Sequence, residues 1–213
     1  MQRTTWLKLG VAALLVVGLP WLFLRTVRDT IAEPYTVAQE ALSGWTLAIH
    51  ETRQPAPAVI TLLPPDGLVS DLFQQIFRRT MESMTTPARP AMPVVLQSEF
   101  AASLREVLSP EAMLAAARAS GLEDARFEPV CMAVKREPSG GRTRQLYFVV
   151  FEAPAFTQFR LDLVRLYAAR GGAAPFDPAA LELVLPVASS DADFAGWWPL
   201  EVDREGDCRA QLR

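Results

Sequence analysis

The pattern of hydrophobic and polar positions changes sharply near residue 25. Residues 6–24 (WLKLGVAALLVVGLPWLFL) are almost entirely apolar, with Lys8 as their only charge. These 19 residues, at a helical rise of about 1.5 Å each, suit the roughly 30 Å hydrocarbon core of a bilayer. Trp6 and Trp21 stand near the two ends, where aromatic rings prefer the interface. The pattern predicts a transmembrane helix, within a membrane anchor over 1–28.

The same apolar run could instead belong to a signal peptide that is cleaved. Such a peptide has a shorter apolar stretch and a small-x-small cleavage site, whereas Arg25-Thr-Val-Arg28 follows here. The sequence therefore favours an uncleaved signal-anchor. The flanking charges do not orient it, because Arg3 and Lys8 balance the two arginines on the other side. The α-amino group and the short N-terminal tail favour a cytoplasmic N-terminus and an extracytoplasmic domain, periplasmic if the source is bacterial.

Beyond residue 28, a juxtamembrane connector over 29–43 leads into a domain over 44–213 in which two periodicities alternate. Apolar runs or alternation, bounded by Pro and Gly, predict strands at 45–50, 59–63, 94–97, 126–136, 145–152 and 181–187, with a last strand within 198–212. Apolar residues at 3/4 spacing predict helices at 68–84, 98–108, 110–120 and 154–170. Residues 138–142 predict a hairpin turn. This order predicts an α+β sandwich with one or two lobes.

The charge balance narrows the choice of partners. From residue 34 onward there are 17 basic and 22 acidic side chains, a net charge of about −5. This leaves no strong basic field, so we expect no nucleic-acid partner. The partners predicted are the lipid bilayer, through residues 6–24, and an unidentified protein.

Two cysteines, Cys131 and Cys208, are the only pair in the chain. Cysteine pairs persist as disulfides in oxidising compartments, which agrees with an exported domain. The alternative is two buried free thiols in a cytosolic domain, since cysteine is often simply buried.

Candidate catalytic groups are few. His50 is the single histidine, which excludes a two-histidine relay or a multi-histidine metal site within one chain. Asp203, Glu205 and Asp207 alternate near the end, but the full ligand set of a Ca²⁺ loop is missing, so a solvated turn is the better interpretation. We predict no metal and no cofactor.

Two segments carry a resemblance to a known superfamily. Residues 58–63 (AVITLL), followed by a turn and a long helix, resemble the first H-x-[ST]-x motif of the two-histidine phosphoesterases, the RNA ligase-like and cyclic phosphodiesterase group. Val59 would occupy the histidine position and Thr61 the hydroxyl position. Residues 146–167 and 176–185 resemble the strand, helix and second motif, with Glu182 and Val184 at the two key positions.

The resemblance covers about two-thirds of the chain in its order of elements, but three of the four motif positions depart from the pattern. In that family the two histidines act as general acid and base, and both are absent here. The resemblance therefore implies a bilobal α+β fold whose catalytic site has been lost.

Three functions are compatible with the sequence. The first is a non-catalytic anchored domain that binds a partner or acts in assembly at the membrane. The second is a divergent phosphoesterase-like enzyme that uses Thr61 and Glu182 across a groove, with His50 as a further catalytic candidate. The third is a structural spacer without a sizeable cleft. The absence of any chemically complete motif favours the first.

Overall fold

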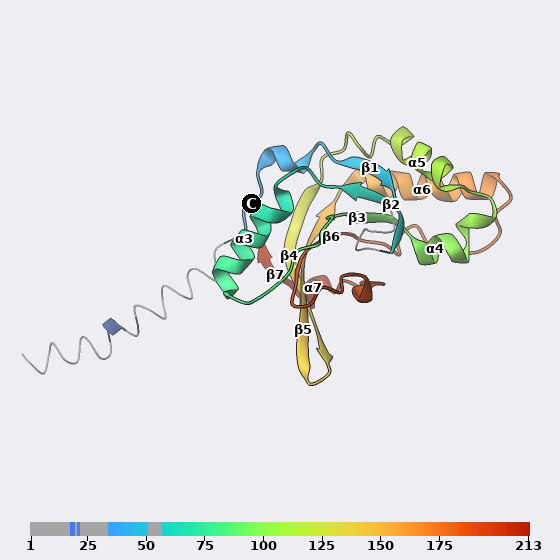
Figure 1. Ribbon diagram of the computed structural model, residues 1–213. Coiled ribbons are helices and arrows are strands. Elements are labelled where there is room, and N and C mark those ends of the chain that lie inside the picture. Colours follow the sequence, from blue (N-terminus) through green and yellow to red (C-terminus); the bar gives the residue numbers. More distant parts are fainter. Residues whose placement is uncertain (1–17, 20, 22–33, 51–56) are drawn as a thin grey trace, which may run out of the picture. The chain divides into compact units, whose positions relative to one another are not determined.

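The computed structural model describes residues 18, 19, 21, 34–50 and 57–213 (Figure 1). The chain divides into two compact units, Met1–Pro34 and Tyr35–Arg213. Of the anchor predicted over 1–28, only residues 18, 19 and 21 are described, so the rest of it lies outside the described residues. In the described part of the chain, no helix combines the length and the apolar character that crossing a membrane requires.

The second unit begins at Tyr35 rather than at residue 44. The Tyr35 side chain is buried, and its backbone N–H donates a 3.0 Å hydrogen bond to the Gln211 carbonyl. The Arg213 N–H returns a 2.8 Å bond to the Tyr35 carbonyl. Residues 35–37 therefore run along the last strand, and the short 3-10 helix η2 (Gln39–Leu42) follows. The chain enters this unit beside its own C-terminal strand.

Two antiparallel sheets form the framework of this unit, which confirms the α+β class. The first has the order β1-β2-β3 and contains β1 (Thr46–Ile49), β2 (Ala58–Leu63) and β3 (Met92–Leu96). The second has the order β6-β5-β4-β7 and contains β4 (Glu128–Ser139), β5 (Arg142–Glu152), β6 (Leu183–Ser189) and β7 (Cys208–Gln211). Every predicted strand is present, although the last one is shorter than expected.

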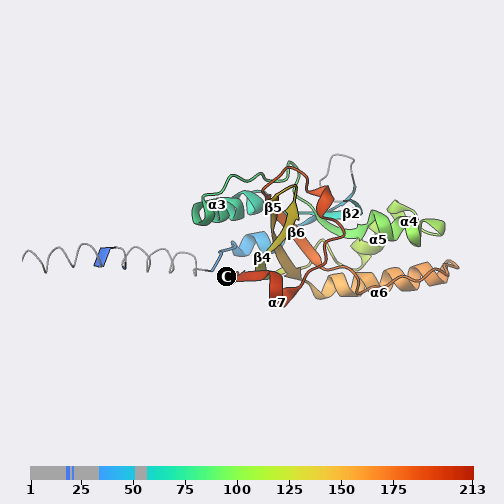
Figure 2. The same ribbon diagram turned by 90° about the horizontal axis from the view of Figure 1, so that it is seen from below.

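The helices gather at two ends of the strands, as Figures 1 and 2 show. One end holds α3 (Leu68–Thr80), close to the C-terminus. The other end holds α4 (Gln97–Ala102), α5 (Pro110–Ala119) and α6 (Pro154–Ala169), with the 3-10 helix η3 (Leu104–Glu106) between the first two. The 3-10 helix η4 (Ala195–Trp197) and the single-turn α7 (Arg204–Asp207) lie in the segment that returns to β7.

The β4–β5 hairpin extends well beyond its sheet (Figure 1). Ser139 pairs with Arg142, so the turn is only Gly140 and Gly141. Both glycines have positive φ, 55° and 79°, as the two central positions of a type I′ turn require. The predicted hairpin is therefore confirmed.

The four-stranded sheet is covered on both faces. Alternate residues of β5, such as Val149 and Phe151, point into the main core shared with the helices. Their neighbours, such as Phe148 and Val150, enter a smaller core with Phe194 and Trp197. This alternation is the period of two that places successive strand residues on opposite faces. The segment after β6 is thus packed on the sheet rather than loose on the surface.

The most unusual core residue is Arg160, which is completely buried on the inner face of α6. Its Nη1 lies 3.1 Å from one carboxylate oxygen of Glu99, and its Nη2 pairs with the other. The guanidinium also donates to the carbonyls of Asp177 (2.9 Å) and Pro178 (3.1 Å). The same Glu99 carboxylate accepts the Leu96 N–H at 2.9 Å, at the start of α4. One ion pair therefore joins two helices and an irregular loop.

We expect Glu99→Gln to destabilise the domain by about 3–5 kcal/mol, because it leaves the buried Arg160 charge without its partner. Urea unfolding of the full chain in detergent, followed by tryptophan fluorescence, measures the change. The matched control is Arg165→Gln on the same helix, which removes an exposed pair with Asp162 (2.8 Å) and should leave the midpoint unchanged. Equal midpoints for the two variants would contradict this role for Arg160.

Candidate functional site

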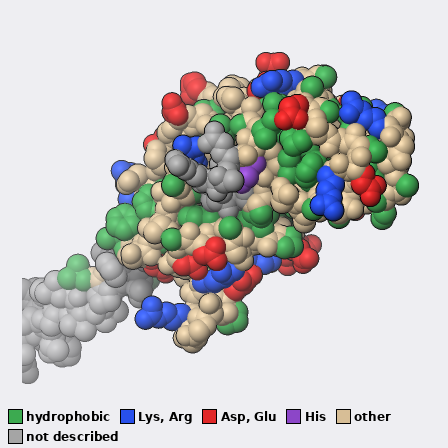
Figure 3. Space-filling model, turned by 45° about the vertical axis from the view of Figure 1, so that its right-hand side comes forward, with side chains coloured by type: hydrophobic (Ala, Val, Ile, Leu, Met, Phe, Trp, Pro, Cys, Tyr) green, Lys and Arg blue, Asp and Glu red, His purple; other side chains and the backbone are tan. Residues whose placement is uncertain are grey.

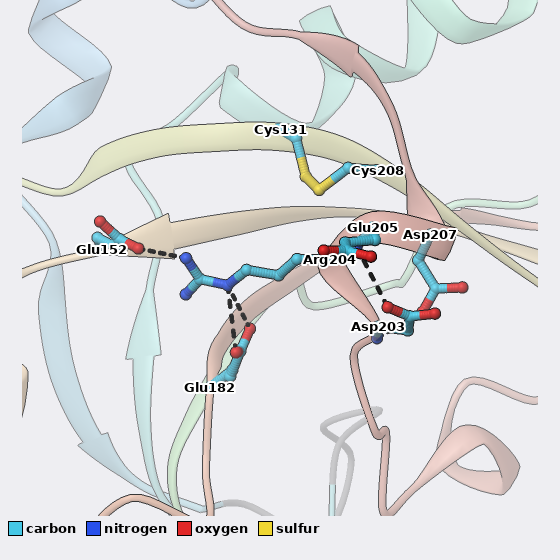
Figure 4. Close-up of a disulfide and its surroundings, with 8 residues drawn as sticks. All are labelled: Cys131, Glu152, Glu182, Asp203, Arg204, Glu205, Asp207 and Cys208. Atoms are coloured by element: carbon cyan, nitrogen blue, oxygen red, sulfur yellow. Dashed lines mark hydrogen bonds and ion pairs between the residues drawn. A yellow bond between two sulfur atoms is a disulfide. The ribbon is translucent and has the colours of Figure 1, made fainter.

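Arg204 lies between two glutamates that come from distant parts of the chain (Figure 4). Its Nη1 pairs with Glu152 at the end of β5, and its Nε lies 3.2 Å from Glu182, directly before β6. The hydrogen bond to Glu152 raises the pKa of Arg204; partial burial opposes this, and the negative charge of Glu182 adds to it. The guanidinium therefore stays charged between two carboxylates.

The pairing of β5 with β6 explains why a cation is needed here. Phe151 pairs with Leu183 in this antiparallel ladder. One further step of the register places Glu152 opposite Glu182. Like charges directly across a strand pair are destabilising, and Arg204 neutralises one of them.

Beside this ion triad is a cleft of about 710 Å³, within the range of small-molecule and cofactor pockets. Its walls are largely apolar and come from the first turns of α6 and from the loop before β6. Phe156 and Leu161 form one wall, and Pro178 and Leu181 form the other. Leu161 is 40% exposed although it is a large apolar residue. The carboxylates of Glu152 and Glu182 and the guanidinium of Arg204 line the mouth of the cleft. Together they carry one excess negative charge.

A disulfide between Cys131 and Cys208 fixes the segment that carries Arg204 (Figure 4). The two Cα atoms are 5.7 Å apart, and the bond ties the residue after α7 to β4. Lys135 of β4 adds an ion pair to Asp207 at 3.2 Å and a hydrogen bond to the Glu201 carbonyl at 2.9 Å. The predicted disulfide is confirmed, and its place beside the cleft is a finding of the structure.

The residues predicted from sequence do not come together. Glu182 lines the cleft. The Thr61 side chain is completely buried in β2, in the other sheet, and its hydroxyl faces the Ala48 carbonyl at 3.5 Å. The proposed Thr61–Glu182 groove therefore does not form from these two side chains.

His50, directly after β1, is half-buried and does not line the cleft. Its ring Nδ1 is buried without a hydrogen-bond partner in the described part of the chain. On the face shown in Figure 3, the histidine is visible in purple, and basic and acidic side chains are scattered over the rest of this face. The hydroxyl and the two carboxylates that line the cleft, Thr157, Glu152 and Glu182, therefore do not have His50 among them.

The acidic residues near the C-terminus have structural contacts. Asp203 accepts the Glu205 N–H at 3.2 Å and caps α7, while Asp207 accepts the Asp203 N–H at 3.0 Å. Across the described ranges, no three His, Cys, Asp or Glu side chains are grouped so that they could hold a metal ion.

Comparison with protein-family models, with curated proteins and with solved structures finds no match to this chain. The resemblance to two-histidine phosphoesterases therefore stays a prediction, and function must be argued from the cleft and its charges.

Removing the disulfide should lower the free energy of unfolding of the domain, and it should leave the segment that carries Arg204 held less firmly against β4. We expect the Cys131→Ala/Cys208→Ala double variant to lose about 2–5 kcal/mol of unfolding free energy. The comparison is urea unfolding of the full chain with and without reductant. Reductant should shift the midpoint of the wild type toward that of the double variant and leave the double variant unchanged. A reductant-insensitive wild type, with Cys131 and Cys208 shown to be reduced, would contradict the expectation.

Proposed function

We propose that the protein is a single-pass membrane protein whose extracytoplasmic domain binds a segment of a partner protein in the Arg204 cleft. The observation that carries the proposal is the open apolar cleft with a charged mouth, built from residues that the disulfide and the ion triad hold in place. A spacer domain would need no such cleft.

Two observations support the proposed location of the protein in the membrane. The apolar run over 6–24 has the length of a transmembrane helix. The disulfide between Cys131 and Cys208 belongs to the kind of bond that persists outside the cytosol. The cytoplasmic N-terminus and the exported domain are therefore proposed together.

The lining of the cleft suggests the chemistry of its occupant. Phe156, Leu161 and Pro178 offer an apolar surface, and Glu182 is half-buried at its edge. With one negative charge in excess, the mouth favours a cation. We therefore propose an extended peptide segment in which a large apolar side chain stands next to a lysine or arginine.

The cleft supports binding better than catalysis. Both carboxylates at its mouth already serve as partners of the Arg204 guanidinium. A divergent phosphoesterase-like activity remains the alternative proposal, because Glu182 does line the cleft. That alternative requires Glu182→Gln to abolish turnover, whereas the binding proposal does not.

The anchor is tested by extraction of native membranes at alkaline pH. We expect the full chain to stay in the membrane pellet and a variant lacking residues 1–28 to be released, because the remaining chain has no comparable apolar run. In the same membranes, Cys131 and Cys208 should react with a maleimide only after reduction. Release of the full chain would contradict the anchor, and labelling without reductant would contradict the compartment.

The binding proposal is tested with two labelled pentapeptides, Gly-Phe-Lys-Phe-Gly and Gly-Phe-Glu-Phe-Gly, and full-length protein in nanodiscs. Fluorescence anisotropy should show about fivefold tighter binding of the lysine peptide, the factor that corresponds to roughly 1 kcal/mol for an exposed ion pair. Glu182→Gln should remove most of this preference. Glu201→Gln, an exposed glutamate that does not line the cleft, is the matched control. Equal affinities for both peptides would contradict a cation-selective mouth.

A further inference from the structure

The last turn of α3 presents apolar side chains that the domain leaves uncovered. Phe77 is 41% exposed and Met81, the residue after the helix, is 74% exposed. The apolar stripe predicted over 68–84 is therefore only partly buried: Leu72 and Ile76 are in the core, while the stripe continues outward at its C-terminal end. We name Phe77 and Met81, with Arg78 between them, the α3 tip.

The α3 tip is pre-formed rather than loose. The rings of Phe73 and Phe77 stack with centroids 6.3 Å apart, which supports Phe77 from the half-buried turn before it. Met81 ends the helix with φ of 54°, and its N–H still donates to the Phe77 carbonyl at 2.8 Å. A left-handed backbone is unfavourable for methionine, and at this position it ends the helix.

The chain enters the domain beside the same end of α3. The Arg79 guanidinium lies 3.8 Å from the centroid of the Tyr35 ring. One turn earlier, Gln75 exchanges two 2.9 Å hydrogen bonds with the backbone of Thr36. Only the ten residues 25–34 separate this point from the apolar run, and ten residues span at most about 35 Å. Any bilayer that holds residues 6–24 is therefore within that distance of Tyr35.

The charges around the α3 tip suit a lipid headgroup region. Arg78 and Arg79 lie in the last turn, and Glu82 is the only acid in residues 77–84. In the connecting segment 25–34, Arg25 and Arg28 are balanced by Asp29 and Glu33, so the excess of basic charge comes from the last turn of α3. Aromatic and large apolar side chains flanked by arginines are the composition of segments that insert into the interface of anionic membranes.

We propose that the α3 tip is seated in the interface of the same bilayer that holds residues 6–24. This inference rests on the proposed anchor and extends it: the domain has a second, shallow contact with the membrane, which fixes its orientation and turns α3 toward the lipid. The occupant is the bilayer surface, and neither a second copy nor another protein is needed to cover Phe77 and Met81.

The test uses full-length protein in nanodiscs of phosphatidylethanolamine and phosphatidylglycerol. Phe77→Cys receives a nitroxide label, and Leu161→Cys on α6 is the matched control, because Leu161 is a large apolar residue with nearly the same exposure, 40%. The native cysteines are joined in the disulfide and do not react. We expect the Phe77 label to collide severalfold more with oxygen than with a water-soluble nickel chelate, and the Leu161 label to show the reverse. Met81→Cys should behave as Phe77→Cys does.

Two results would contradict the proposed membrane contact of the α3 tip without contradicting the anchor. The first is that the nickel chelate reaches the Phe77 label as readily as it reaches the Leu161 label, while the protein still resists extraction from the discs at alkaline pH. The other is a Phe77 label shielded from both reagents, which means that protein covers it. Extraction of the chain from the discs at alkaline pH would instead refute the anchor, and with it the contact proposed here.

Discussion

The buried pair of Arg160 and Glu99 is the interaction on which the cleft depends. Residues 176–178 have no regular secondary structure, and the guanidinium holds them through two backbone carbonyls. This loop then supplies Pro178 to the wall of the cleft. An ion pair in the core gains most when every hydrogen-bonding group of both partners is used. The helix start at Leu96 and the loop carbonyls use those groups, so the charge, the helix and the cleft wall form one unit.

The opposite side of the cleft is held differently. Between β6 and β7 the chain has only two short helical turns, and β7 is four residues long. Arg204 is exposed, so its pairs with the two glutamates add little to stability by themselves. The disulfide and Lys135 position this segment on β4 instead. The cleft therefore has one wall fixed by a desolvated charge, while the segment with the guanidinium at its mouth is fixed by a covalent bond.

Local patterns in the sequence predicted the local elements, and the long-range arrangement lay beyond them. Alternation and 3/4 spacing located the strands and helices, and two cysteines allowed only one pair. Arg160 was missed although it stands four residues after Phe156 on the same helical face, because a charge was not expected among apolar positions. Arg204 carried no local signal at all, since its partners are known only once β5 is paired with β6. Thr61 and Glu182 were placed across one groove because of the resemblance of their segments to the two motifs, yet β2 and β6 belong to different sheets.

The bridge between Tyr35 and β7 determines how force would pass through the domain. If the domain is tethered as proposed, load enters at Tyr35, which is bonded to the strand that carries Cys208. Tension applied at Tyr35 passes to β7 and then through the sulfur bridge to β4, the inner strand next to β5. The load thus reaches the centre of the larger sheet through the same disulfide that fixes the Arg204 segment. Under the proposed anchor, a pull from the membrane would therefore also bear on the charged residue at the mouth of the cleft.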